Sequence, residues 1–219
     1  MNNIVNHYIM TIVKHSDTGG IKMSKILSIM NERRTRYGLA KSTTVSNDAV
    51  RALVEEAVQV VPSAFNAQTQ RVVVLFDDAS DKFWDLTREE LRKVAPAEGF
   101  ENTIAKLESF KQGNGTILYF YDTNVVEGLQ SQFALYADNF PIWAQQENGM
   151  LQYTVWTALT EAGLGASLQH YNPIVYAAAA QEWDLPANWK LVAQMPFGEA
   201  VDTPQAKELA PVADKVKVF

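Results

Sequence analysis

The sequence contains no cysteine and only three histidines. Without cysteine the chain can form no disulfide, zinc–thiolate site, iron–sulfur cluster or thiol nucleophile. Two of the histidines, His7 and His15, lie in an N-terminal stretch that reads as peripheral, which leaves His170 for the body of the protein. We therefore expect neither a Ser-His-Asp triad nor a histidine-rich metal site, and we predict no bound metal.

An excess of positive charge and a long apolar run are also missing. The net charge is −6 and the isoelectric point about 5.1, which disfavours general nucleic-acid binding, because the phosphate backbone attracts basic surfaces. No apolar run approaches the ~20 residues of a membrane helix. The run over residues 9–13 is too short for a secretory signal. We expect a cytoplasmic protein that binds neither nucleic acid nor membrane.

The length and composition are those of one soluble domain. At 219 residues, with 47% hydrophobic and 20% charged residues, the chain can bury a core of its own. Residues 1–22 show no amphipathic period and end in Asp17-Thr18-Gly19-Gly20. This favours a flexible tail over the alternative, an arm that packs on a partner chain. Residues 23–219 are predicted to form a single domain.

The hydrophobic pattern predicts an α/β (α+β) fold with a mixed central sheet flanked by helices. Helical spacing predicts helices that start at Met23–Lys25 and at Ser46 or Asn47, then over about 79–94, 101–110, 123–137 and 142–162, and from Pro173. Apolar runs predict strands over 71–76, 116–121, 166–171 and 189–196. The helix over 142–162 is apolar nearly all round, which indicates burial in a core or an interface.

Three segments could take part in chemistry, and each taken singly is also well explained structurally. The basic cluster Arg33–Arg36 suits a phosphate, because guanidinium forks match phosphate oxygens; the alternative is a solvated helix end. Loop 62–70 offers hydroxyls and amides for a polyol or a heteroaromatic edge, but polar loops are common. The glycines of segment 163–171 allow close approach of a ring or phosphate, or simply end a helix.

The motifs of several enzyme classes are absent from the sequence. It has no G-x-G-x-x-G after a strand, no Walker loop, no G-x-S-x-G elbow and no H-E-x-x-H. Tyr136, Phe140, Trp143 and Trp156 could line an aromatic pocket, although an aromatic-rich helix pair is usually core.

In their order along the chain, these segments resemble the flavin-dependent nitroreductase family, and more closely its fatty-acid-repression-mutant-like or copper-induced branch. The resemblance rests on an Arg-Arg-Thr box, a Pro-Ser-x-x-Asn-x-Gln loop, a helix that ends in Gly-Leu-Gly and a closing Pro-Phe-Gly segment. In this sequence these are Arg33–Thr35, Pro62–Gln68, Gly163–Gly165 and Pro196–Gly198, the last followed by Pro204 and Lys207. The resemblance covers residues 24–219.

The resemblance implies an interlocked homodimer that binds two FMN molecules at the subunit interface, with the helix around 149–162 in the dimer core. The phosphate ligands that it implies are Arg33, Arg34, Thr35 and Lys207. The residues that would approach the flavin from the other subunit are Ser63, Asn66 and Gln68. Those that would lie along the isoalloxazine, with backbone N–H groups near N5 and O4, are Ser167, Leu168, Gln169 and His170.

The implied activity is an NAD(P)H-dependent reduction of nitroaromatic or quinone-type acceptors by a ping-pong flavin mechanism. Hydride would pass from the nicotinamide to flavin N5 and then to the acceptor, so no catalytic side chain is required. The residues expected to line the acceptor slot are Phe65, Tyr136, Phe140, Trp143 and His170. Two alternatives stay open: a flavin-binding stress or lipid-signalling regulator with little turnover, and a cofactor-free interaction domain.

The sequence departs from the family pattern at three places. Gln169 stands where many members carry a glutamate on the strand beside flavin N5, and Tyr37 stands where a basic residue is often found. The Lys-x-Arg ending of other branches is missing, which leaves Lys207 alone. The physiological oxidant and the preferred nicotinamide do not follow from the sequence.

Overall fold

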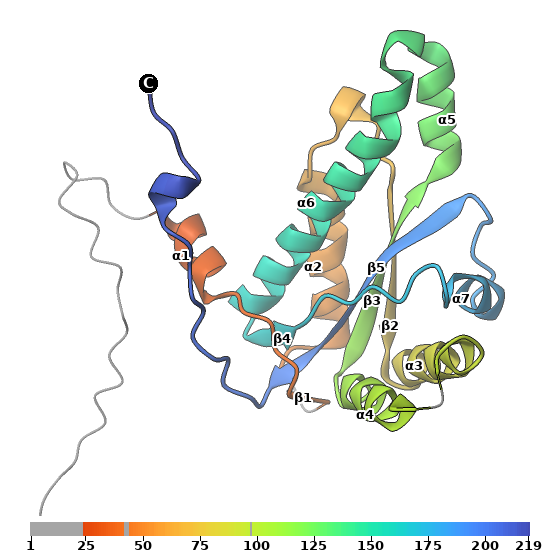
Figure 1. Cartoon of the computed structure of the whole chain (residues 1–219), viewed down its shortest axis with the longest axis vertical. Coiled ribbons are helices and arrows are strands. Elements are labelled where there is room, and N and C mark those ends of the chain that lie inside the picture. The colour runs from red at the N-terminus through yellow and green to blue at the C-terminus, as the bar shows by residue number, and fades with distance from the viewer. Residues whose placement is uncertain (1–23, 42–43, 97) are drawn as a thin grey trace, which may run out of the picture.

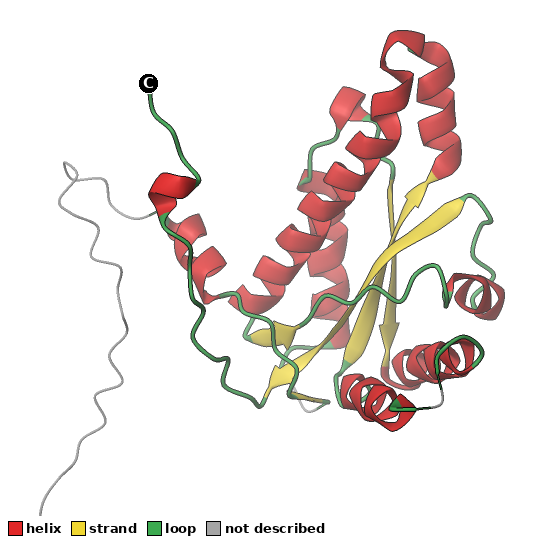
Figure 2. Cartoon of the chain, in the orientation of Figure 1, coloured by secondary structure: helices red, strands yellow, loops and turns green. Residues whose placement is uncertain are grey.

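A computed structural model of the chain describes residues 24–41, 44–96 and 98–219 (Figure 1). The predicted tail, residues 1–22, lies outside the described residues. The helices are α1 Lys25–Glu32, α2 Asn47–Val60, α3 Asp77–Arg92, α4 Phe100–Phe110, α5 Thr123–Gln132, α6 Phe140–Glu161 and α7 Tyr176–Glu182, with short 3₁₀ turns η1 Ala64–Asn66, η2 Ala134–Asn139 and η3 Val212–Asp214. The strands are β1 Leu39–Ala40, β2 Gln70–Phe76, β3 Gly115–Asp122, β4 Leu164–Ala166 and β5 Trp189–Ala200 (Figure 2).

The sheet has the strand order β1-β5-β3-β2, with β4 paired to β5. All ladders between these strands are antiparallel, and among the described residues one parallel bridge joins Thr35 to Ala166. Every residue of the central strand β3 is buried, because its side chains alternate between two covered faces. The predicted fold class is therefore confirmed.

Two groups of helices cover the two faces of the sheet (Figure 1). On one face α2 and α6 bury Ile117 and Tyr119 of β3. On the other face α3, α4 and α7 bury Leu118 and Phe120. Trp84 of α3, fully buried, donates its indole N–H to the Thr116 hydroxyl over 2.9 Å, which satisfies its one polar atom.

The predicted elements differ from the structure mainly where the chain approaches and leaves α6. The helix predicted over 123–137 ends at Gln132, because Phe133 leaves the helical region (φ −124°, ψ 64°), and η2 follows. Pro141 does not separate two helices; it occupies the first turn of α6, where its missing N–H is no loss. The strand predicted over 166–171 lies earlier, at Leu164–Ala166, and beyond it only Gln169 bridges β5.

Helix α6 is only half covered within one chain. Leu151, Val155 and Leu159 are fully buried, whereas Met150 and Tyr153 are 43% and 37% exposed. The apolar side chains that surround α6 are thus divided between the core and an uncovered stripe on its surface. In the part of the chain that the structure describes, no helix combines the length and apolar character needed to cross a membrane.

Candidate functional site

The polar and aromatic residues singled out in the sequence gather near opposite ends of α6. This helix has 22 residues and is therefore about 33 Å long. We call residues 33–37 and 202–207, beside its C-terminal half, the basic end. We call the five rings of Phe65, Phe133, Tyr136, Phe140 and Trp143, at its N-terminal turns, the aromatic end. Figure 1 shows α1 at one end of α6, and η1 and the tip of α5 at the other.

The basic end is formed where the chain leaves α1. Arg33 adopts an extended backbone (ψ 117°), and the next residues run beside β4: Thr35 bridges Ala166, and the Arg36 N–H donates to the Ala166 carbonyl over 2.9 Å. This brings residues 34–37 against the segment that follows β5. Together they line a pocket of about 370 Å³, and its lining residues are Arg34, Thr35, Tyr37, Asp202, Thr203, Pro204, Gln205 and Lys207.

The arginines of the basic end have unused donors. The Arg34 guanidinium donates to the Gln205 carbonyl, while the Arg33 guanidinium lies over the Trp156 ring, 4.4 Å from its centroid. In the described chain the Nε atoms of both arginines are buried without a hydrogen-bond partner. A buried donor without an acceptor is unfavourable, so these groups suit an anionic ligand. Arg33 precedes the lining residue Arg34 but is not itself among the residues that line the pocket.

Arg36 is engaged differently from its neighbours. Its guanidinium forms an ion pair with Asp202 over 3.4 Å and donates to the Asp202 backbone carbonyl. The Asp202 carboxylate also accepts the N–H groups of Tyr37 and Gly38, over 3.0 and 3.1 Å. Burial alone raises the pKa of Asp202, but these hydrogen bonds and the Arg36 charge outweigh it and hold the pKa below its ordinary value.

The segment 167–170 continues from β4 and runs along β5, to which it is joined by hydrogen bonds. Ser167 and Gln169 donate their backbone N–H groups to Pro196 and Gln194, over 3.2 and 2.7 Å. Their side chains are buried, and the Gln169 amide donates to the Ser167 hydroxyl over 3.0 Å. The N–H groups of Leu168 and His170 point the other way in this alternation and meet no acceptor among the described residues. Such N–H groups can donate hydrogen bonds to acceptor atoms at the edge of a bound ring.

The aromatic end brings together four of the five predicted slot residues and adds Phe133, whereas the fifth, His170, lies in segment 167–170 beside β5. The Phe65 ring lies within 6 Å, centroid to centroid, of the other four; it stacks on Trp143 at 5.8 Å and approaches Phe133 to 4.9 Å. Phe133 was not predicted, although its spacing of three residues from Tyr136 was visible in the sequence. The Phe65 side chain is 51% exposed and Tyr136 is 41% exposed, so this cluster presents aromatic surface.

The loop that holds Phe65 has an unusual backbone. Phe65, Asn66 and Gln68 adopt positive φ angles of 58°, 52° and 49°, which cost of order 1 kcal/mol each in residues other than glycine. Two hydrogen bonds close the loop: Gln68 N–H to the Ser63 hydroxyl over 3.0 Å, and Asn66 N–H to the Ser63 carbonyl over 3.1 Å. The predicted residues Ser63, Asn66 and Gln68 therefore lie at the aromatic end, far from the basic end.

A buried carboxylate fastens the end of this loop to α6. Glu147, 2% exposed, accepts the Thr69 hydroxyl over 2.6 Å and the Gln70 N–H over 3.4 Å. Burial raises its pKa above the ordinary value, although the bonds from Thr69 and Gln70 oppose that shift. Nothing in the local sequence distinguishes Glu147 from a surface glutamate.

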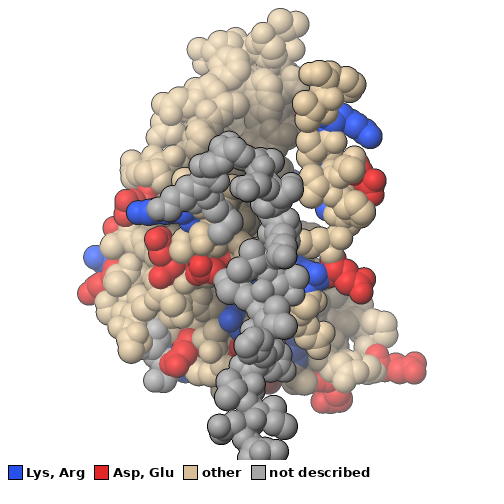
Figure 3. Space-filling model, turned by 90° about the vertical axis from the view of Figure 1, so that its left-hand side faces the viewer, with Lys and Arg blue, Asp and Glu red and all other residues tan. Residues whose placement is uncertain are grey.

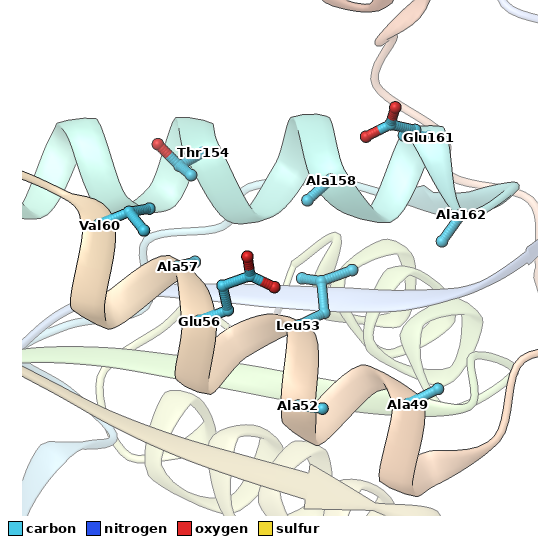
Figure 4. Close-up of a pocket in the computed structure, with 10 residues that line it drawn as sticks. All are labelled: Ala49, Ala52, Leu53, Glu56, Ala57, Val60, Thr154, Ala158, Glu161 and Ala162. Carbon is cyan, nitrogen blue, oxygen red and sulfur yellow. The ribbon is translucent and has the colours of Figure 1, made fainter.

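A shallow groove of about 640 Å³ lies along α2 and α6 (Figure 4). The residues that line it are mostly small and apolar. They are Ala49, Ala52, Leu53, Glu56, Ala57 and Val60 of α2, Thr154, Ala158 and Glu161 of α6, and Ala162, which follows α6. Small side chains on facing helices leave room for the side chains of another element. The groove lies on the helix layer that leaves part of α6 uncovered.

The comparisons with known proteins agree with one another. A family model described as the Nitroreductase family matches residues 30–199. The nitroreductase FRM2 of Saccharomyces cerevisiae is 34% identical over 184 residues, which are 83% of this chain and 91% of that protein.

Solved structures with similar folds have been described with small molecules bound. The nitroreductase CinD of Lactococcus lactis in complex with nicotinic acid has a TM-score of 0.82 at 45% identity, and its complex with 4-nitrophenol 0.80 at 43%; each covers 88% of this chain and 98% of that one. A nitroreductase of Desulfovibrio desulfuricans in complex with FMN has a TM-score of 0.65 at 20% identity, over 90% of this chain and 99% of that one.

Proposed function

Since the chain belongs to the nitroreductase family, we propose that it is a homodimeric, cytoplasmic FMN-dependent oxidoreductase that uses NAD(P)H to reduce nitroaromatic or quinone-type acceptors. The main observation behind this proposal is the pocket at the basic end, where Arg34, Thr35 and Lys207 come together from both ends of the described chain. Cofactor, donor and acceptor are all parts of the proposal.

The basic end fits the phosphate of FMN. A phosphate monoester has a charge of about −1.5 to −2 at neutral pH, and the pocket lining supplies two cationic side chains, Arg34 and Lys207, together with hydroxyl groups such as that of Thr35. The one carboxylate in the lining, Asp202, is paired with Arg36. The buried Nε atoms of Arg33 and Arg34 supply further donors that have no partner within the described chain. Stacking on Trp156 holds the Arg33 guanidinium against α6. In a chain of net charge −6, such a local cluster is needed to attract an anion at all.

The separation of the two ends supports a dimer. Within one chain, about 20 Å of α6 separates Trp143, against which Phe65 stacks, from Trp156, over which Arg33 lies. We infer that the basic end and the loop 63–68 that meet at one flavin come from two chains. A second copy in antiparallel orientation would place its loop at the first copy's basic end, and a two-fold axis would repeat the arrangement. The uncovered stripe of α6 and the groove between α2 and α6 supply apolar surface for that contact (Figure 4).

The chain's own residues would then orient the reactants. The N–H groups of Leu168 and His170 are available to an acceptor at the edge of the flavin ring. When bound, FMN supplies the redox chemistry, accepting hydride from NAD(P)H and passing it to the oxidant. The aromatic end offers flat apolar surface for a ring and excludes water from it. Nicotinic acid and 4-nitrophenol, which CinD binds, are flat aromatic rings that such a surface could contact.

An absorption spectrum of the purified protein tests the proposal. We expect a yellow protein that bleaches with NADH under anaerobic conditions and regains its colour when a nitroaromatic or quinone is added. A flavin that NADH cannot bleach would favour a regulator with little turnover. A colourless protein that also ignores added FMN would contradict the proposal as a whole.

A further inference from the structure

The third arginine of the basic cluster has no part in the proposed phosphate pocket. Arg36 is not among the lining residues, and its guanidinium is occupied by Asp202. Asp202 itself lies two residues beyond the end of β5, in a segment without helix or strand. What this pair does for the site is therefore an independent question.

Residues 201–207 continue from the end of β5 and are hydrogen-bonded to the segment that follows α1. All hydrogen bonds of this segment within the described residues are made with residues 34–38: Val201 N–H to the Gly38 carbonyl over 3.0 Å, Arg34 to the Gln205 carbonyl, and the bonds to Asp202. The Asp202 carboxylate takes part in three of them and is the one acidic group involved. Without the Asp202 carboxylate, three of the six hydrogen bonds would be lost.

Gly38 and Asp202 are also closely packed against each other. A Cβ atom on Gly38 would come within 2.8 Å of the Asp202 Cβ and 3.2 Å of the Asp202 backbone nitrogen. Residue 38 must therefore be glycine for Asp202 to reach the backbone N–H groups of residues 37 and 38. The carboxylate fits this position because two backbone donors and a guanidinium converge on it.

We propose that Asp202 is a positioning residue for the phosphate site: with Arg36, Tyr37 and Gly38 it forms a C-terminal latch that places Lys207 opposite Arg34 and Thr35. Five of the eight residues that line the pocket belong to the segment that the latch fastens. Asp202 also balances the charge of Arg36, which leaves Arg34 and Lys207 as the cations that face the ligand. This inference rests on the proposed binding of FMN.

The test compares FMN with riboflavin, which has the same ring but no phosphate. We would measure both dissociation constants by quenching of flavin fluorescence, with wild-type protein, Asp202→Asn and Gly38→Ala. Asp202→Asn removes the charge at almost unchanged shape, and Gly38→Ala displaces the carboxylate without changing charge. For both variants we expect FMN to bind about tenfold more weakly and riboflavin to bind as before, because only FMN uses the phosphate pocket.

Asp214→Asn is the matched control, since it removes the same charge from an exposed aspartate outside the pocket. It should leave both constants unchanged. A second readout needs no flavin: hydrogen exchange of residues 201–207 should accelerate in Asp202→Asn and not in Asp214→Asn.

The latch is contradicted if Asp202→Asn leaves FMN binding unchanged, or weakens FMN and riboflavin by the same factor, as a general loss of structure would. Unchanged exchange in residues 201–207 would also contradict it. A wild-type protein that binds no FMN would overturn the proposed function, and the phosphate role of the latch with it. If the wild type binds FMN and both variants bind it with the same affinity, the latch alone would be overturned.

Discussion

The two ends of α6 are built by opposite means. The aromatic end is held by ring packing among five side chains and by the buried carboxylate of Glu147. The basic end is held by hydrogen bonds and one ion pair between residues that lie 164 to 171 positions apart in the sequence. In the view of Figure 3, the upper part of the molecule, toward the tip of α5 and α6, shows hardly any charged side chains, and most of the charges lie lower.

This difference indicates which properties each end controls. Packing of large rings contributes strongly to the free energy of unfolding, because buried apolar surface does so in proportion to its area. Partly exposed hydrogen bonds contribute less to that free energy, but they decide where charged groups stand. We therefore expect changes at the aromatic end to affect stability most, and changes at the basic end to affect binding of an anion most.

The largest effect is expected from Phe140→Ala. Phe140 is 3% exposed and contacts the rings of Phe65, Phe133 and Trp143. Its truncation leaves a cavity and should lower the free energy of unfolding by about 3 kcal/mol, measured by urea denaturation. The ratio of the riboflavin and FMN dissociation constants should stay near the wild-type value. Unchanged stability would show that the ring cluster does not hold this end.

Arg34→Ala should have the next largest effect, and on binding instead of stability. Losing a charged donor to the phosphate should weaken FMN binding by about 100-fold, with a much smaller change for riboflavin. Arg92→Ala, which removes the same charge from the exposed end of α3, is the control. Equal losses for FMN and riboflavin in the Arg34 variant would contradict the phosphate assignment.

Gln68→Gly should separate the strain of the loop from its contacts. Gln68 has a φ of 49°, which glycine adopts freely, so the free energy of unfolding should rise by about 1 kcal/mol. Flavin binding should weaken at the same time, because the proposed side-chain contact is lost. Gln68→Ala keeps the strain and loses the contact, so it should weaken binding without gaining stability. Thermal unfolding and flavin titration of both variants measure the two effects.

The smallest expected effect is a pH dependence. The pKa of Glu147 is higher in the folded chain than its ordinary value of 4.5, so its contribution to stability is present below about that pH and lost as the pH rises through the folded pKa. Glu147→Gln cannot ionise. Its free energy of unfolding should therefore rise relative to that of the wild type as the pH increases from 4.5 to 8.

Glu127→Gln, at an exposed position of α5, is the control for Glu147 and should show no such trend. Urea denaturation at several pH values gives both curves. If Glu147→Gln lost stability relative to the wild type at high pH, the ionised carboxylate would be the stabilising form, contrary to the shift found here.

The sequence predicted most of the fold where local periodicity is strong. Helices α2, α3 and α4 and strands β2, β3 and β5 lie where the apolar pattern placed them, within a few residues except at the C-terminal end of β5. It missed β1, and it placed β4 too late, because both short strands depend on partners far away: Gly165 pairs with Gly198, and Leu39 with Ala200. No local pattern shows such pairings.

The candidate site was only partly visible in the sequence. Resemblance to a family singled out Arg34, Thr35 and Lys207, and the fold places them around one pocket. Asp202 and Glu147 were not foreseen, since their importance comes from what meets them in space: two backbone N–H groups in one case, and Thr69 in the other. The separation of the two ends could not be seen either, because it depends on where α6 begins and ends.

Complementation between two altered chains tests the central claim, that each flavin site needs two copies of the chain. An Arg34→Ala chain and an Asn66→Gly/Gln68→Gly chain would be coexpressed with different tags, the heterodimer isolated, and its bound FMN titrated. If each site combines the basic end of one copy with the loop of the other, one site is intact, and the heterodimer binds about one FMN with wild-type affinity. If each site lies within a single chain, both sites are altered, and the heterodimer has no tight FMN site.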